Sequence, residues 1–170
     1  MSPGTAGPIH AYLSGHGKDG AGRSLDSVLA LSDRQLERIH DYIQWLFPLP
    51  TRSMAQPHSP VLTGEEIEAI RADPAALANL ARATERMLVF YRQTDDWLVP
   101  SDHNHLRISR ILQSLSILSG PEAARRFYTA IIARVEATGT RIAPGNRRYW
   151  DAAVQAEGAG GGKPPGGRAT

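Results

Sequence analysis

Apolar residues recur at intervals of three and four along most of this chain, and no segment shows the strict alternation of a half-buried strand. The longest series follows Asp73 and Pro74, a pair typical of a helix cap and first helical position, and predicts a helix that ends near Tyr91. Shorter series predict helices that begin at or near residues 24, 32, 63, 101, 120 and 144. The sequence therefore predicts a single compact all-α domain of six to seven helices.

Capping signals mark the start of two of these helices. Ser32 followed by Gln35, and Thr63 followed by Glu66, match the pattern in which two side chains satisfy each other's backbone amides. The helix that opens at Ser32 is expected to run without interruption to Pro48, which lacks the amide hydrogen needed to continue it. Its expected apolar positions are Leu36, Ile39, Tyr42, Ile43 and Leu46.

The two ends of the chain differ in composition from its middle. Residues 1–23 are rich in Gly and Pro and predict an irregular, extended arm, anchored on the body by Ile9, Tyr12 and Leu13. Residues 158–170 are mostly Gly, Pro and charged residues, so we expect a disordered tail. The helical domain is then expected to span residues 24–157.

Composition narrows the classes of function. The chain has 170 residues, 41% of them hydrophobic, which is enough for a core, but no apolar run approaches the roughly 20 residues of a transmembrane helix. It contains no cysteine and opens without a basic, apolar leader, so we expect a cytoplasmic protein. The net charge of +2 and the short arginine clusters do not favour nucleic-acid binding. No phosphate loop, dinucleotide fingerprint or nucleophile elbow is present, and no cofactor is expected.

The adjacent pair His40 and Asp41 suggests one catalytic alternative. Metal-dependent phosphohydrolases use such a pair together with further His and Asp ligands, and His103 is a candidate third ligand. This alternative, a metal-assisted hydrolase, competes with a structural role in which His40 is a partly buried histidine bonded to a neighbour.

A binding site is the other interpretation of the same segments. His103 and Arg107 lie four residues apart near a predicted helix start, where a carboxylate or phosphate would be favoured. If the helices face each other, His40, Gln44, His103, Asn104 and Arg107 would line a cleft that selects a polar or anionic group. Alternatively, Arg107 pairs inside the fold with Asp41 or Glu37.

Aromatic residues accompany the first of these segments. Trp45 belongs to a set of aromatic side chains for which core packing and ligand stacking are both open. We include it among the candidate ligand-binding residues, which are His40, Gln44, Trp45, His103, Asn104 and Arg107.

Two blocks of the chain resemble the conserved region of the opioid growth factor receptor family. The first block reads HDYIQWLFPLP at residues 40–50 and the second HNHLRISRIL at residues 103–112. PHSPVLT at 57–63 and RMLVFY at 86–91 also match in kind, so the similarity covers roughly residues 9–155. This short chain resembles a compact, bacterial relative of the animal members of that family.

The resemblance implies a helical domain without catalytic residues. Animal members are receptors for an enkephalin-type growth-inhibitory peptide and are associated with the nucleus and its membrane. It therefore favours a non-enzymatic binding domain that recognises a peptide or small anionic ligand, or a protein partner. A nucleic-acid-associated protein is the second alternative, because of the arginines and the family's nuclear association.

Overall fold

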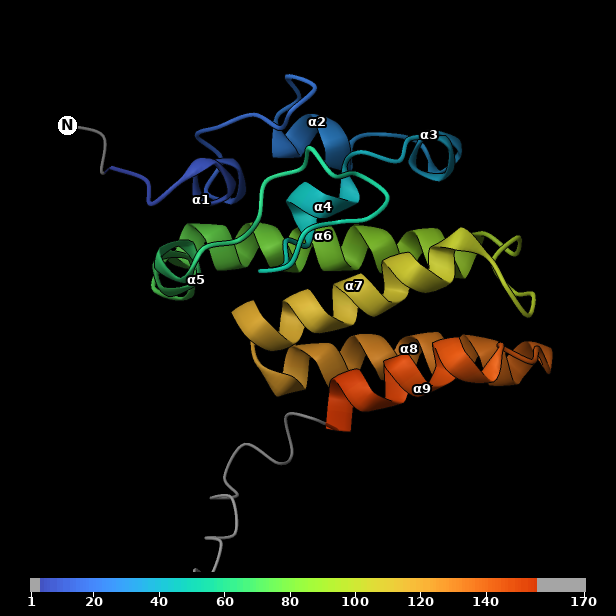
Figure 1. Ribbon diagram of the computed structural model, residues 1–170. Helices are drawn as coiled ribbons and strands as arrows, with labels where there is room; N and C mark the ends of the chain where they lie inside the picture. Colours follow the sequence, from blue (N-terminus) through green and yellow to red (C-terminus); the bar gives the residue numbers. More distant parts are fainter. Residues whose placement is uncertain (1–3, 156–170) are drawn as a thin grey trace, which may run out of the picture.

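The computed structural model describes residues 4–155, in which every regular element is a helix and no strand occurs (Figure 1). Nine helices follow one another in this part of the chain: α1 (Pro8–Leu13), α2 (Leu25–Leu29), α3 (Asp33–Arg38), α4 (Ile43–Leu46), α5 (Gly64–Arg71), α6 (Pro74–Gln93), α7 (His103–Leu118), α8 (Pro121–Thr138) and α9 (Pro144–Gln155). The all-α prediction is confirmed, and the number of helices exceeds the expected six to seven for two local reasons given below.

The long helices α6 and α7 run through the middle of the molecule (Figure 1). The short helices α1 to α4 lie on one side of α6, while α8 and α9 lie on the far side of α7 and pack against it. The loop between α4 and α5 passes in front of α6 and returns the chain to the end of the molecule where α5 lies.

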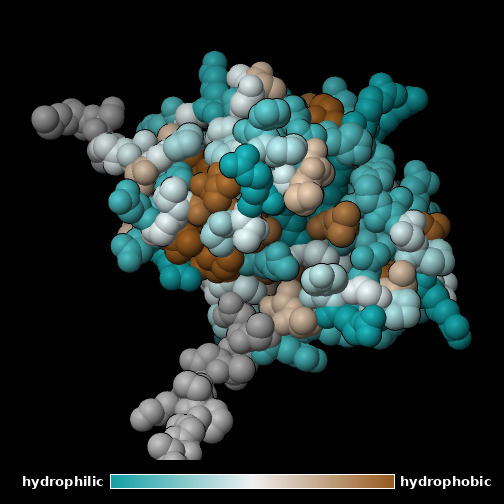
Figure 2. All heavy atoms as spheres, viewed as in Figure 1, coloured by the Kyte–Doolittle hydropathy of each residue, from teal (hydrophilic) through white to brown (hydrophobic). Residues whose placement is uncertain are grey.

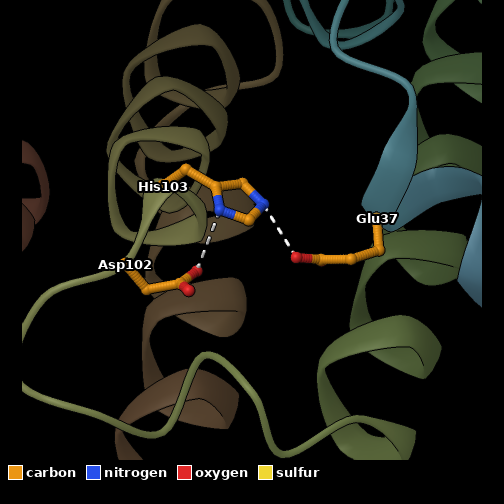
Figure 3. Close-up of side chains that lie close together, drawn as sticks. All are labelled: Glu37, Asp102 and His103. Atoms are coloured by element: carbon orange, nitrogen blue, oxygen red, sulfur yellow. Dashed lines mark ion pairs between the residues drawn. The ribbon is translucent and has the colours of Figure 1, made fainter.

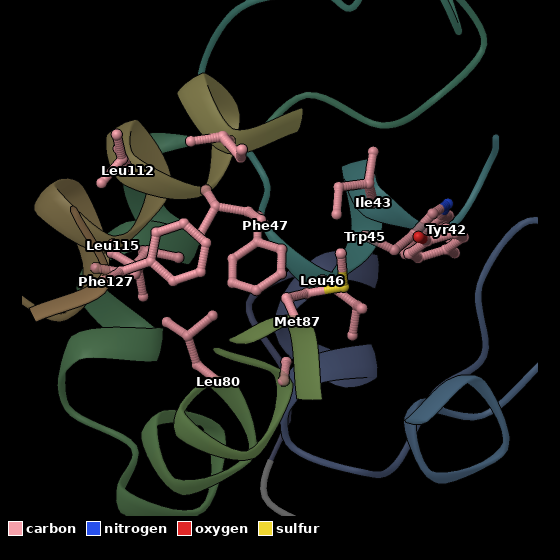
Figure 4. Packing of buried hydrophobic residues seen from close by; sticks show 14 of the residues in the cluster. Tyr42, Ile43, Trp45, Leu46, Phe47, Leu80, Met87, Leu112, Leu115 and Phe127 are labelled. Atoms are coloured by element: carbon pink, nitrogen blue, oxygen red, sulfur yellow. The ribbon is translucent and has the colours of Figure 1, made fainter. Parts of the chain in front are cut away.

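A continuous hydrophobic core joins these layers. Figure 4 shows Phe47, at the end of α4, pointing between α6 and α7, with Leu80 and Met87 on one side and Leu115 on the other. All four side chains are almost completely buried. Burial of such side chains contributes about 1.5–3 kcal/mol each, so the short helix α4 is held mainly by its insertion into the core.

The helix expected to run from Ser32 to Pro48 is broken into α3 and α4, which corrects the prediction. Ile39 ends α3 in an extended conformation, with φ −86° and ψ 131°. In a continuous helix the Leu36 and Ile39 carbonyls would accept from amides four residues ahead. Here both carbonyls accept from the Arg107 guanidinium of α7, at 2.9 and 2.8 Å. A side chain from a distant helix therefore replaces the local bonds.

The segment expected to be an irregular arm contains α1, the second additional helix. Its predicted anchors Ile9, Tyr12 and Leu13 are fully buried, as the sequence indicated. The carboxylate of Glu66 accepts from the His10 amide at 2.9 Å and so satisfies an amide in the first turn of α1. Gly7 precedes this turn because a Cβ there would lie 2.6 Å from the Glu66 carboxyl carbon.

Most predicted caps are confirmed. The Ser32 and Gln35 side chains form the reciprocal capping box of α3. Asp73 accepts from the amides that open α6, and Asp102 accepts from the Asn104 amide of α7. Thr63 caps α5, whereas its expected partner Glu66 bonds to α1 instead of the cap amide.

Two further expectations concern the chain ends and the membrane. The predicted tail at 158–170 lies outside the described residues. Among the helices at 4–155, none is both long and apolar enough to traverse a bilayer.

Candidate functional site

A row of polar side chains on α7 binds the broken segment of the chain. Its members are Asn104, Arg107, Arg110 and Ser114, spaced by three, three and four residues so that they follow one stripe of the helix. All four donate hydrogen bonds to residues 36–48, and we call them the polar row of α7. The row joins the two sequence blocks that resembled one family.

Within this row, Arg107 makes the most hydrogen bonds to residues 36–48. Besides the two carbonyls of α3, its guanidinium donates to the Tyr42 hydroxyl at 3.2 Å and to Nδ1 of His40 at 3.2 Å. Its carbon Cζ lies 5.3 Å from the centre of the Tyr42 ring, a cation–π contact. The side chain is only 6% exposed and forms no salt bridge with a carboxylate among the described residues. The expected pairing of Arg107 with Asp41 or Glu37 is therefore wrong, because neutral acceptors take its donors.

The other two members of the row, Arg110 and Ser114, bind backbone carbonyls at the end of α4. Nε of Arg110 donates to the Phe47 carbonyl at 2.8 Å, and the Ser114 hydroxyl donates to the Pro48 carbonyl at 2.8 Å. These are carbonyls that α4 leaves unsatisfied when Pro48 ends it. The terminal nitrogens of Arg110 donate to no group in the part of the chain that the structure describes.

A pocket of about 440 Å³ opens beside this row, between the residue 49–55 loop, α7 and α9. Its charged and polar lining consists of His40, Gln44, Thr51, Arg52, Ser53, His103, Arg107, Ser109, Arg110 and Gln113. Its apolar lining consists of Ile43, Leu49, Met54, Ala55, Leu106 and Tyr149. Among residues 4–155, three arginines line it and no Asp or Glu does, so the pocket has a positive electrostatic character.

Burial destabilises the charged form of one of these arginines. Removal of the Arg110 guanidinium from water lowers its pKa to about 10. The side chain stays cationic at neutral pH, but its charge is only partly hydrated and has no anionic partner within residues 4–155. A ligand anion placed in the pocket would supply that partner.

Two histidine rings stand at the edge of the pocket. The rings of His40 and His103 are 5.4 Å apart, edge to face. Burial, and then the charges of Arg107 and His103, lower the pKa of His40, so its ring is held in the neutral form that accepts a hydrogen bond from Arg107. Nε2 of His103 lies 2.8 Å from a carboxylate oxygen of Glu37, which links α7 to α3 (Figure 3).

The structure brings together four of the six predicted ligand-binding residues. His40, Gln44, His103 and Arg107 line the pocket, so the expected cleft between the two segments exists. Asn104 is not in the lining. It is 1% exposed, and its amide oxygen accepts from the Tyr91 hydroxyl at 3.2 Å.

Trp45 takes no part in the pocket. It is 9% exposed and packs edge-on against Tyr12, with ring centres 5.5 Å apart. Of the two open alternatives for this residue, core packing is the one that its surroundings fit.

Sequence reasoning missed the loop and α9 side of the pocket. Arg52, Met54 and Tyr149 reach it from segments whose relative placement no local pattern indicates. One sequence feature could have indicated two of them: Met54 and Tyr149 are large apolar residues that do not fall on the apolar face of a predicted helix. They are 93% and 63% exposed in the structure.

The ligand set expected for a metal-assisted hydrolase is not assembled. The Asp41 carboxylate accepts from Nη2 of Arg23 at 2.7 Å, and Nδ1 of His40 is occupied by Arg107. Within residues 4–155, the three side chains whose donor atoms lie within 4.8 Å of one another are Glu37, Asp102 and His103. The nearby His105 cannot join His103 as a metal ligand, because His105 is fully buried and bonds to the Trp97 carbonyl at 2.8 Å.

Comparisons with known proteins agree with the two blocks. Residues 30–135 match the model of the opioid growth factor receptor (OGFr) conserved region. The chain is similar to the opioid growth factor receptor of Mus musculus, with 39% identity over 101 residues, 49% of this chain and 16% of that protein. It is similar to the Homo sapiens receptor, with 33% identity over 131 residues, 62% of this chain and 19% of that protein.

A second group of relatives carries a related name. Opioid growth factor receptor-like protein 1 of Mus musculus is 35% identical over 101 residues, 49% of this chain and 22% of that protein. The alignments thus cover about a fifth of each relative's length, and no solved structure matches the chain. The matched region, 30–135, includes both blocks and the polar row of α7 that joins them. By this match, the chain belongs to the family of the opioid growth factor receptor conserved region.

Proposed function

We propose that this domain is a non-enzymatic binding module whose ligand, a peptide or a small molecule, places an anionic group in the pocket beside α7. The observation that carries the proposal is the set of three arginines, Arg52, Arg107 and Arg110, in a pocket to which the described part of the chain contributes no carboxylate. Guanidinium groups bind carboxylates and phosphates through paired, charge-assisted hydrogen bonds.

The three arginines contribute differently. Arg107 already donates to backbone and side-chain acceptors, so its role is to supply a fixed positive field. The terminal nitrogens of Arg110 bond to none of residues 4–155, and burial has destabilised its charge. We therefore assign direct contact with the anion to Arg110, with Arg52 adding charge from the exposed loop.

The mouth of the pocket is apolar. Leu106, Met54 and Tyr149 line it and are 67%, 93% and 63% exposed, three of the four large apolar side chains that are exposed on the described part of the chain. On the face shown in Figure 2, apolar patches lie where the loop after α4 crosses α6 and along α7. A ligand with an apolar portion next to its anionic group would cover this rim.

The names of the relatives are compatible with this assignment. Several are called receptors, a name that implies ligand binding by the whole protein. The proposal for this chain rests on the residues of its own pocket and not on those names.

The test is thermal unfolding of the purified domain with inorganic phosphate and with short apolar peptides, each peptide made with a free and an amidated carboxyl terminus. A ligand at 100 times its Kd stabilises the folded state by about 2.7 kcal/mol, which raises Tm by several degrees. We expect the free acids or phosphate to stabilise the domain and the amides to have a much smaller effect.

Two variants with the same loss of charge make the test specific. Arg110→Gln removes the proposed anion contact, whereas Arg125→Gln removes an arginine of α8 outside this pocket. The ligand-induced shift should vanish in the first and remain in the second. Equal shifts with acids and amides, equal shifts in both variants, or no shift with any probe would contradict the proposal.

A further inference from the structure

Three side chains of types that can bind a metal ion lie close together where α3 faces the start of α7. Glu37 comes from the last turn of α3, and Asp102 and His103 are the cap and first residue of α7 (Figure 3). Nε2 of His103 lies 2.8 Å from Glu37 Oε1, and its Nδ1 lies 3.6 Å from Asp102 Oδ1. One donor atom from each residue can be chosen so that all lie within 4.8 Å of one another.

The buried side-chain amide of Asn104 donates hydrogen bonds to both carboxylates. Nδ2 of Asn104 donates to Glu37 Oε2 at 2.9 Å and to Asp102 Oδ1 at 3.0 Å. The Asn104 amide is itself oriented, because its oxygen accepts from the Tyr91 hydroxyl at 3.2 Å and from Arg107 at 3.4 Å. Hydrogen-bonded carboxylates with a rigid supporting partner are the usual environment of metal ligands.

We propose that Glu37, Asp102 and His103 bind one divalent transition-metal ion. One imidazole nitrogen and two carboxylate oxygens suit Zn²⁺ and its neighbours in the first transition series better than Ca²⁺ or Mg²⁺, which take oxygen ligands. Three protein ligands leave at least one coordination position to water. This site differs from the His40, Asp41 and His103 set, and it does not depend on the proposed binding of an anion.

Metal entry requires a defined rearrangement. In Figure 3 the two carboxylates face different nitrogens of the His103 ring, whereas an ion bonds to only one of them. The His103 side chain is 42% exposed, so its ring has room to turn while Asn104 keeps the carboxylates in place. The coordinating nitrogen must be unprotonated, so the ion and a proton compete for it.

Co²⁺ serves as the optical probe. We expect the metal-free domain to take up one equivalent of Co²⁺ with visible ligand-field absorption, and to lose that absorption when one equivalent of Zn²⁺ is added. Calorimetric titration with Zn²⁺ should show weaker binding as the pH is lowered, because protons compete with the ion for its ligands.

Matched variants separate this site from other histidines. Glu37→Gln and His103→Gln each remove one ligand and should weaken binding of Co²⁺ at least tenfold. His58→Gln changes an exposed loop histidine outside the cluster and should bind as the unmodified chain does. Absence of binding, binding unchanged in Glu37→Gln, or binding lost in His58→Gln would overturn the proposal.

The Glu37→Gln variant also keeps this inference distinct from the proposed function. Glu37 does not line the pocket, and Arg110 remains intact, so this variant should still be stabilised by the anionic probes. Loss of metal binding with retained anion binding supports the metal site, whereas retained metal binding refutes it whatever the anion result.

Discussion

Helix α7 contacts two of its neighbouring regions, α8 and residues 36–48, by different means. Toward α8 the contact is apolar, built from residues such as Leu115 of α7 and Phe127 of α8, and no side-chain hydrogen bond joins these two helices within residues 4–155. Toward residues 36–48, the polar row of α7 supplies hydrogen bonds to four backbone carbonyls in addition to apolar packing by Phe47.

The difference shows what each kind of contact can specify. Apolar packing accepts any helix with a suitable stripe, so α8 keeps the helical bonds that its own sequence favours. Hydrogen bonds from α7 to the Leu36 and Ile39 carbonyls take the place of the backbone amides that would bind these groups in a continuous helix. The polar row therefore stabilises a break that local propensity alone would not produce.

The largest expected effect comes from removing the centre of the row. Arg107→Met keeps much of the side-chain volume, but it leaves the Ile39 carbonyl and Nδ1 of His40 without a donor and the Leu36 carbonyl with the Tyr42 hydroxyl alone. Since each unsatisfied buried acceptor costs about 1–3 kcal/mol, the free energy of unfolding should fall by about 3–5 kcal/mol in urea titration. Arg107→Lys should recover little of this loss, because one ammonium cannot reproduce the planar fork.

A surface arginine provides the control for that experiment. Arg125→Met on α8 should change the free energy of unfolding by no more than about 0.5 kcal/mol. If Arg107→Met cost as little, the hydrogen bonds of Arg107 would not be what holds the broken segment.

A smaller effect compares the two kinds of contact directly. Ser114→Ala removes one hydroxyl and leaves the Pro48 carbonyl without its donor, whereas Ile111→Val removes one methyl from the apolar core. We expect losses of about 1–3 and about 0.5–1.5 kcal/mol respectively, measured by urea unfolding.

Hydrogen exchange in Ser114→Ala and Ile111→Val provides the control for this comparison. Ile111→Val should leave the protection of residues 36–48 against hydrogen exchange unchanged relative to the rest of the core, while Ser114→Ala should lower it near Pro48. Identical exchange patterns in both variants would remove the distinction between the two contacts.

The smallest effect concerns Tyr42 and pH. Its hydroxyl donates to the Leu36 carbonyl at 2.8 Å, and burial raises its pKa to about 12. Because the folded-state pKa lies above the unfolded value of 10, its contribution is complete below pH 10 and falls as pH rises toward 12. Tyr42→Phe should cost about 1 kcal/mol at pH 7 and flatten the decline in stability over that alkaline range.

An exposed tyrosine is the reference for this measurement. Tyr149 is 63% exposed, so Tyr149→Phe should leave the alkaline decline as it is in the unmodified chain. A Tyr42→Phe profile that falls as steeply as that of Tyr149→Phe would show that the Tyr42 hydroxyl is not held in the protonated form by the fold.

Much of the fold follows from local sequence, and the exceptions have a common cause. The long helices α6, α7 and α8 begin and end close to the predicted positions, because a capping residue or a Gly-Pro pair coincides with the start of each apolar series. The break at Ile39 depends on Arg107, which lies 68 residues away, and the α1 cap depends on Glu66, which lies 56 residues from His10. No local pattern contains such partners.

The candidate site divides in the same way. Residues within the two blocks were predicted to face one another, and His40, Gln44, His103 and Arg107 do so at the pocket. Arg52 and Tyr149 come from a loop and from α9, whose positions depend on the whole fold. The carboxylate Glu37 meets His103 only because α3 ends where the polar row of α7 binds it.

Residue-resolved hydrogen exchange in the Arg107→Lys variant tests the central claim that the polar row of α7 holds the broken segment. We expect protection of residues 36–48 to fall well below that of α6 and α8 in the variant, while those two helices keep their relative protection. Uniform loss of protection across the molecule, or unchanged protection at residues 36–48, would contradict it.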